Sequence, residues 1–323
     1  MSIPTEKISE NRLIYMGTPQ FAAIILDGLL QDGWRPAAVV SQPDRPRGRG
    51  RKLLPSPVSA IALAEKIPLW QPHQLKGKDF IAQVQSLEPD FILTAAYGKI
   101  LPTEILTLPR LGCYNIHASL LPAYRGAAPV QQAIIDGQTE TGITIFRMDE
   151  GIDTGEIVAT ERLAIEPAET AGELTERLAR LASRMLIPVM EKVALGQARF
   201  QPQSDEQASL APILNKADGR LDWRLAAEEI HNRIRGLDPW PGVFTFLHGK
   251  RLRIWRAEVE DKETIGLPGT IHFISEKGMT VQTGKGRLLI LELQLEGKKR
   301  MPVGQFIRGY QVKTGEKLDE STK

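Results

Sequence analysis

The chain has 323 residues, of which 42% are apolar and 25% are charged, and its net charge is +2. These values are ordinary for globular proteins and exclude a fibrous or largely disordered chain, and the length predicts two domains. The single cysteine, Cys113, excludes an internal disulfide framework and any multi-cysteine metal site. We expect it to be a small buried hydrophobic residue beside a strand in a protein of a reducing compartment.

The start of the chain carries no targeting signal that we can identify. Its first residues, M-S-I-P-T-E-K-I-S-E-N-R, lack an apolar core and include two acidic side chains, so neither a signal peptide nor a typical transit peptide is expected. No apolar run approaches the ~20 residues that cross a bilayer. We therefore expect a cytoplasmic protein that does not bind a membrane.

The N-terminal part alternates between short apolar runs and segments with helical spacing. The apolar runs predict buried strands at residues 13–16, 37–40, 91–96, 113–117 and 143–146. Helical spacing is found at residues 20–30, 57–66, 130–135 and, over a longer stretch, 171–195. Strands that alternate with helices predict an α/β fold, with a Rossmann-like, mostly parallel sheet and helices on both faces.

The C-terminal part has a different pattern. Residues 204–212 have no core periodicity, which predicts a first domain at 1–203, a linker at 204–214 and a second domain at 215–323. A short helix is expected at residues 226–234. Five short runs separated by turn residues follow at 243–247, 252–255, 269–273, 279–283 and 288–293. Strands of this size predict a smaller C-terminal β-barrel of the oligonucleotide-binding kind (OB-like).

Charge is divided unevenly between the two parts. Residues 1–214 hold 21 basic and 24 acidic side chains, a net charge of −3, whereas residues 215–323 hold 20 basic and 15 acidic ones, a net charge of +5. A basic second domain is compatible with a polyanionic partner. A mixed, solvated surface explains the same numbers equally well.

An amide and an imidazole stand two residues apart in the run at 113–117. Asn115 and His117 would project from the same face of a strand, and S-L-L-P-A-Y-R-G follows shortly after them. In open α/β sheets, ligands bind beyond the carboxyl ends of the strands, where this pair is expected. A lone histidine often only satisfies a loop carbonyl, but the pair favours a site that polarises a carbonyl group and moves a proton.

A carboxylate that could join this pair lies in M-D-E-G-I-D-T-G, residues 148–155. Asp153 stands between two glycines in a predicted tight loop after a strand, where the backbone can approach a ligand closely. Its charge would orient His117. The alternative is a turn aspartate that bonds only its own backbone, and Asp149 competes for the same role.

A cluster of positive charge lies in residues 42–52, Q-P-D-R-P-R-G-R-G-R-K. Such a segment predicts an exposed, mobile loop that clamps phosphates or an acidic substrate, and a plain solvated loop is the alternative. Its cationic residues are Arg45, Arg47, Arg49, Arg51 and Lys52. The chain has neither a P-loop nor G-x-G-x-x-G, and its histidines are scattered, so nucleoside triphosphate, dinucleotide and zinc sites are not predicted.

Two segments, N-I-H-A-S-L-L-P-A-Y-R-G-A-A-P and M-D-E-G-I-D-T-G, resemble the folate-dependent formyltransferases. M-G-T-P at residues 16–19, the basic segment and A-A-Y-G-K-I-L-P at residues 95–102 are similar to the branch that acts on methionyl-tRNA. One departure is D-P-W-P at residues 238–241, where that branch usually has N-P-W-P. The resemblance covers nearly the whole chain, from about residue 12 to about residue 308.

The resemblance implies a formyl transfer without a metal. Asn115, His117 and Asp153 would be the catalytic residues. The donor would be 10-formyltetrahydrofolate, and the acceptor would be the α-amino group of initiator methionyl-tRNA. The basic segment would bind this tRNA, and Arg49 would contact the acceptor end of the tRNA. The folate would lie against Ser119, Leu120, Leu121 and Pro122. Nothing in the sequence demands more than a monomer.

Two alternatives stay open. A formyltransferase that acts on a sugar nucleotide or another small amine, or a hydrolase of formyl-folate, would not need the basic segment or a basic second domain. A non-catalytic nucleic-acid-binding protein would not need Asn115, His117 and Asp153 to be intact.

Overall fold

The computed structural model describes residues 12–47, 52–260 and 266–318. The chain forms two compact units. The first consists of Met1–Pro129, Glu140–Ala164 and Thr175–Ala211, and the second of Val130–Thr139, Ile165–Leu174 and Pro212–Lys323. Two short segments therefore belong to the second unit although they lie inside the predicted first domain. The domain limits at residues 203 and 215 stay a prediction.

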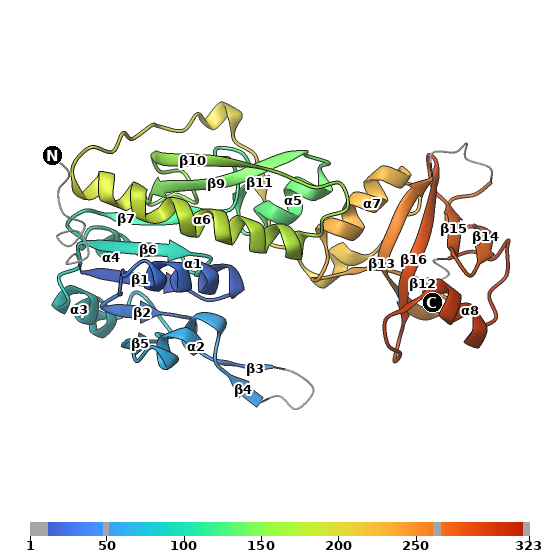
Figure 1. The fold of residues 1–323 in the computed structure, drawn as a ribbon, viewed down its shortest axis with the longest axis horizontal. Coiled ribbons are helices and arrows are strands. Elements are labelled where there is room, and N and C mark those ends of the chain that lie inside the picture. Colours follow the sequence, from blue (N-terminus) through green and yellow to red (C-terminus); the bar gives the residue numbers. More distant parts are fainter. Residues whose placement is uncertain (1–11, 48–51, 261–265, 319–323) are drawn as a thin grey trace. The chain divides into compact units, whose positions relative to one another are not determined.

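The first unit is built on a seven-stranded sheet in the order β10-β9-β7-β6-β1-β2-β5 (Figure 1). The five neighbouring strands β5, β2, β1, β6 and β7 pair in parallel. β9 is antiparallel to both of its neighbours, β7 and β10. The mostly parallel sheet that the sequence predicts is confirmed. The strands are β1 (Leu13–Gly17), β2 (Ala38–Val40), β5 (Leu69–Trp70), β6 (Phe91–Ala95), β7 (Cys113–His117), β9 (Glu140–Arg147) and β10 (Ile157–Ala164).

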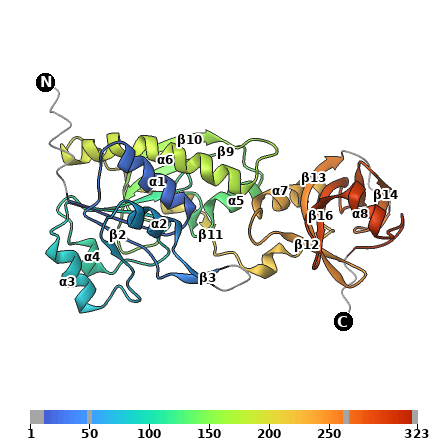
Figure 2. The same ribbon diagram turned by 60° about the horizontal axis from the view of Figure 1, so that its bottom comes forward.

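Helices cover both faces of this sheet, as predicted (Figures 1 and 2). On one face, Phe80 and Val84 of α3 and Ile105 of α4 pack against strand residues such as Ile14 and Ile92. The central strands read as continuous apolar runs because both of their faces are buried. The helices of the first unit are α1 (Gln20–Gln31), α2 (Pro57–Ala64), α3 (Lys78–Ser86), α4 (Thr103–Leu106) and, from Thr175 on, α6 (Ala171–Ala194). α5 (Pro129–Ile135) belongs to the second unit from Val130 on. None of the helices in the described part of the chain is long and apolar enough to cross a membrane.

The basic segment differs from the prediction of a loop. Two short strands, β3 (Arg45–Arg47) and β4 (Lys52–Leu54), pair there as an antiparallel hairpin. Pro46, which has no N–H, lies opposite Leu53 in a two-stranded ribbon where a missing donor is tolerated. Arg49 and Arg51, together with the side chains of Arg47 and Lys52, lie outside the residues that the structure describes.

The second unit carries an antiparallel sheet in the order β12-β13-β16-β15-β14, with β17 paired to β16. Its inner face packs against Ile230 and Ile234 of α7 in one apolar core. The predicted C-terminal β domain is thereby confirmed. Among the described residues, β12 and β14 are the two edge strands of this sheet. Its elements are α7 (Ala227–Gly236), β12 (Val243–Leu247), β13 (Lys250–Glu260), β14 (Ile271–Ser275), β15 (Gly278–Gln282), β16 (Arg287–Leu295), β17 (Met301–Pro302) and α8 (Val303–Gly309).

The packing of α1 against α6 gives a test of this fold. A Cβ atom added at Gly28 would lie 2.9 Å from the Cβ of Ser183. We expect Gly28→Ala to lower the free energy of unfolding by about 1–3 kcal/mol, because overpacking outweighs the better helix propensity of alanine. Urea denaturation of Gly28→Ala, Ser183→Gly and the double variant measures this. The double variant should lose less than the sum of the two single losses, and a Gly28→Ala protein more stable than the parent would contradict the packing.

Candidate active site

The carboxyl ends of four parallel strands meet at one edge of the first sheet. From β1 the chain adds β2 and β5 on one side of the sheet, and it then crosses over to add β6 and β7 on the other side of β1. The strand order therefore reverses beside β1. Ligands of doubly wound sheets bind at such a switch point. β7 is the neighbour of β6, and His117 is its last residue, with Asn115 two residues before it.

The imidazole of His117 is buried between two oxygen acceptors. Its Nε2 lies 2.9 Å from the backbone oxygen of Tyr124. Because a carbonyl oxygen can only accept a hydrogen bond, Nε2 carries a proton and is the donor. Its Nδ1 lies 3.6 Å from Oδ2 of Asp153, longer than a direct hydrogen bond. The ring of Phe146 packs edge-on at 6.5 Å and holds the imidazole plane. Nδ1 is therefore the ring nitrogen that faces a carboxylate without a direct hydrogen bond to it.

The structure brings Asp153 to His117 by fixing its loop. Oδ2 of Asp153 accepts a hydrogen bond from the backbone N–H of Gly126 at 2.8 Å. The amide of Gln203 donates to the backbone oxygens of Asp153 and Gly155 at 2.9 and 2.7 Å. Asp153 has a φ of +56°, a left-handed conformation that costs free energy in a non-glycine residue, so these bonds are needed to hold it.

Asp149, the competing carboxylate, is engaged in its own turn. Its Oδ1 accepts hydrogen bonds from the backbone N–H of Gly151 at 3.0 Å and from the hydroxyl of Thr154 at 2.7 Å. This is the bonding of a turn aspartate. Of the two aspartates in the loop, the structure places Asp153, and not Asp149, beside the histidine.

The side chain of Asn115 is half-buried and lies on the same face of β7 as His117. Its neighbours in the sheet are Thr94 of β6 and Phe146 of β9. In residues 12–47, 52–260 and 266–318, no protein group forms a hydrogen bond with its amide. An amide N–H₂ without a protein partner next to a buried imidazole can donate to an oxygen of a bound molecule.

The segment from Ser119 to Pro122 forms a rigid turn directly after β7. The hydroxyl of Ser119 donates to the backbone oxygen of Ala123 at 2.7 Å. Thr144 of β9 donates to the oxygen of Ser119 at 2.7 Å and accepts from the N–H of Leu121 at 3.1 Å. The polar groups of the turn are thus occupied, whereas Leu120 and Pro122 are partly exposed. This segment can offer a ligand an apolar wall rather than a serine hydroxyl.

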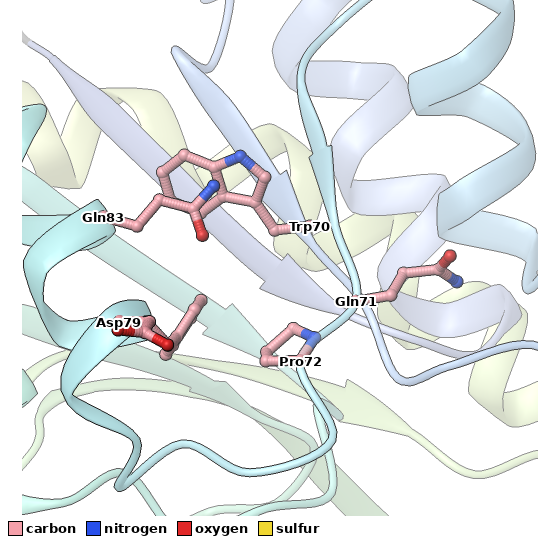
Figure 3. A pocket seen from close by; sticks show the side chains of 6 residues that line it. Trp70, Gln71, Pro72, Asp79 and Gln83 are labelled. Atoms are coloured by element: carbon pink, nitrogen blue, oxygen red, sulfur yellow. The ribbon is translucent and has the colours of Figure 1, made fainter.

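Two hollows lie elsewhere on the first unit. One of about 380 Å³ is lined by Trp70, Gln71, Pro72, Asp79, Phe80 and Gln83 (Figure 3), and none of the three candidate catalytic residues belongs to it. A smaller one, of about 110 Å³, lies at the base of the basic hairpin. It is lined by Thr18, Gln42, Pro43, Asp44, Arg45, Leu54 and Ser56.

The outer face of the second sheet carries arginines stacked on aromatic rings. The guanidinium of Arg251 lies 4.2 Å from the ring centre of Phe244, and that of Arg253 lies 5.7 Å from Trp255. Arg300 covers the same tryptophan at 5.1 Å. Stacking orders a guanidinium and leaves the N–H edges of Arg251 and Arg253 able to bind phosphate. The guanidinium of Arg300 is paired with Glu292 at 2.6 Å. We call these residues the arginine–aromatic face.

Cys113 and His231 are structural residues. Cys113 is buried, and burial raises the pKa of its thiol to about 12, so the interpretation as a small hydrophobic residue is confirmed. Burial and the charge of Arg235 lower the pKa of His231 to about 4, which keeps it neutral. Within the described residues, no group of three or more His, Cys, Asp or Glu side chains is placed to hold a metal ion.

Sequence reasoning missed the residues that support the site. Arg125 donates to Gln203 at 3.0 and 3.1 Å and to Asp205 at 2.8 Å, and so ties the segment after α6 to the turn after β7. The same two segments pair as the short strands β8 (Arg125–Gly126) and β11 (Leu210–Ala211). A glutamine in a segment without periodicity gives no signal of this role, which depends on long-range pairing.

Comparisons with known proteins agree on one family. The model of the formyl transferase family matches residues 11–190, and that of its C-terminal domain matches residues 213–311. The methionyl-tRNA formyltransferase of Moorella thermoacetica is 44% identical over 95% of this chain and 99% of its own. That of Pelotomaculum thermopropionicum is 46% identical over 96% and 99%. The solved structure of WlaRD, a sugar 3N-formyl transferase in the presence of dTDP and 5-N-formyl-THF, has the same fold, with a TM-score of 0.65, 19% identity, and 90% and 99% coverage. The chain belongs to the formyl transferase family, among the methionyl-tRNA formyltransferases.

Proposed function

We propose that Asn115, His117 and Asp153 carry out the transfer of a formyl group from 10-formyltetrahydrofolate to the α-amino group of methionyl-tRNA. The observation that carries this proposal is the meeting of an unpartnered amide, an imidazole and a carboxylate beyond β7. The predicted family and reaction are confirmed by the relatives, and the sugar-nucleotide and non-catalytic alternatives are not favoured. The roles of individual residues are our assignment.

The reaction exchanges one C–N bond for another. The amine nitrogen attacks the formyl carbon, the carbonyl oxygen becomes an oxyanion, and the bond from that carbon to N10 of the folate then breaks. The amine loses a proton and N10 gains one. An α-amino group with a pKa of about 7.7–8.0 is partly neutral at physiological pH, so the site needs a proton relay more than a strong base.

Asn115 is the group best placed to donate to the oxyanion, because its amide has no protein acceptor to give up. His117 has its Nε2 engaged by Tyr124, so we assign its Nδ1, facing Asp153, to proton transfer. Asp153 balances the charge of an imidazolium during the relay. Gly126 and Gln203 act through Asp153 as positioning residues.

The binding surfaces follow from the same assignment. We propose that the folate lies along Leu120 and Pro122 in the turn 119–122, and that the basic segment 42–52 and the arginine–aromatic face bind tRNA phosphates. The limits 1–203 and 215–323 remain our proposal for the catalytic and tRNA-binding domains. Because the whole candidate site comes from one chain and its acceptor is an aminoacyl-tRNA, we propose a monomer that acts in the cytoplasm.

The two aspartates of the 148–155 loop provide a matched test. We expect Asp153→Asn to lower kcat about 100-fold or more, because the shape is kept but the charge beside His117 is lost. Asp149→Asn should leave kcat within about twofold, since an asparagine oxygen still accepts the turn bonds. Formyl transfer to saturating methionyl-tRNA measures both. Equal kcat values for the two variants would contradict the assignment of Asp153.

Asn115→Ala tests the oxyanion donor. Losing one such donor costs about 2.7–4 kcal/mol, so we expect kcat to fall about 10²–10³-fold. Asn115→Asp, which keeps the shape but presents a carboxylate to the oxyanion, should be no more active. If Asn115→Ala raised only the KM for formyl-folate, the amide would be a binding group and not an oxyanion donor.

The arginine–aromatic face is tested by the salt dependence of tRNA binding. We expect Arg251→Met and Arg253→Met each to reduce the slope of log Kd against log salt by about one, as the loss of a phosphate contact does. Arg308→Met, on α8 and paired with Glu276, is the control for a lost surface charge. Filter binding of methionyl-tRNA at several salt concentrations measures the slopes, and equal slopes in all three variants would remove this surface from the interface.

A further inference from the structure

The two partners of His117 are both held by one stretch of chain outside the sheet. Nε2 donates to the backbone oxygen of Tyr124, and Nδ1 faces the carboxylate of Asp153. Neither partner lies on a strand of the seven-stranded sheet, so the hydrogen bonds of the sheet do not fix them. Residues 203–211 bond to both, and nearly all of them lie in the segment without core periodicity. We call residues 203–211 the strap.

One arm of the strap holds Tyr124. The backbone N–H of Tyr124 donates to the hydroxyl of Ser209 at 2.9 Å. The next residue, Arg125, donates its backbone N–H to the backbone oxygen of Ser209 at 2.8 Å. Tyr124 has a φ of +62°, a left-handed conformation that costs free energy in a non-glycine residue. The two bonds offset part of this cost and keep the oxygen of Tyr124 directed at Nε2 of His117.

The other arm holds Asp153 through the amide of Gln203. Arg125 donates to Oε1 of Gln203 from both Nε and a terminal nitrogen, at 3.1 and 3.0 Å. Because a guanidinium only donates, it fixes which end of the amide is the oxygen, and the amide nitrogen faces the oxygens of Asp153 and Gly155. Arg125 is 7% exposed, so water competes little for these bonds. Arg125 therefore sets the orientation of the group that holds the carboxylate loop.

The two arms are joined where β8 pairs with β11. Ala211 of the strap lies opposite Gly126, whose N–H donates to Oδ2 of Asp153 at 2.8 Å. A Cβ atom added at Gly126 would lie 2.6 Å from the backbone oxygen of Ala211, and its φ is +119°, so the close approach requires glycine. A displacement of the strap would move the supports of both ring nitrogens of His117 together.

We propose that the strap positions both partners of His117 during formyl transfer. Its positioning residues are Gln203 and Ser209, and Arg125 acts on both from the turn after β7. This rests on the proposed function, which assigns proton transfer to Nδ1 of His117 and charge balance to Asp153. The whole strap belongs to the first compact unit. A segment that the sequence presents only as a linker is thus part of the catalytic unit.

Gln203→Glu tests the arm on Asp153. Glutamate keeps the shape and pairs with Arg125, but its carboxylate has no N–H for the oxygens of Asp153 and Gly155. We expect kcat to fall about 10–100-fold, as displacement of a catalytic group does, with both KM values within about twofold. The urea midpoint should change little, because the new ion pair offsets the lost bonds. Formyl transfer from formyl-folate to methionyl-tRNA and urea denaturation measure these quantities.

Ser209→Ala tests the arm on Tyr124. Alanine removes the acceptor of the Tyr124 N–H, and we expect kcat to fall about 3–10-fold, the effect of one net hydrogen bond. Ser209→Thr keeps the hydroxyl and should restore most of kcat. Ser86→Ala on α3 is the matched control, because it also loses one exposed hydroxyl bond, to the oxygen of Gln83 at 2.8 Å. Ser86→Ala should leave kcat within about twofold of the parent value.

The results separate positioning from stability and from the proposed function itself. Parent-like kcat in either Gln203→Glu or Ser209→Ala would overturn the claim that one strap holds both partners. A loss of kcat that Ser209→Thr did not restore, or that only followed a lower urea midpoint, would overturn it as well. A parent enzyme that transferred no formyl group to methionyl-tRNA would instead overturn the proposed function.

Discussion

Parallel strands that end at one edge of the first sheet are the constraint on which the candidate site depends. β2, β1, β6 and β7 pair in parallel, so segments far apart in sequence leave the sheet side by side. Thr18 follows β1, Gln42 follows β2 and Tyr97 follows β6, and their hydrogen bonds join three loops that would otherwise move independently. A hairpin with several positive charges gains a fixed base in this way.

The carboxylate reaches the site by a different route. β9 is antiparallel to β7, and its last residue, Arg147, lies opposite Tyr114, three residues before His117. The loop that follows therefore has to return along the sheet before Asp153 can face the imidazole. Its return is stabilised by Gln203 and by the N–H of Gly126, and without these bonds the left-handed backbone of Asp153 would be unfavourable.

This difference explains what could be read from the sequence. Strongly periodic or continuous apolar segments, such as β7 and α6, were predictable because burial dictates their pattern. Exposed elements were not: β10 is mostly solvent-facing, and α3 buries only Phe80 and Val84. The pair of Asn115 and His117 follows from strand alternation alone. The choice of Asp153 over Asp149, and the support from Gln203 and Arg125, depend on long-range pairing that local pattern does not contain.

The distribution of satisfied polar groups separates the supporting residues from the reactive ones. Around the turn after β7, the hydroxyls of Ser119 and Thr144 and the carboxylate of Asp149 all have protein partners at normal hydrogen-bond distances. Buried networks of this kind rigidify a site because an unpaired group costs free energy. Asn115 is the exception, with an amide that lacks a protein acceptor among the described residues. A donor that is left unpaired has no protein hydrogen bond to break when an oxyanion forms beside it, so its interaction is available in the transition state.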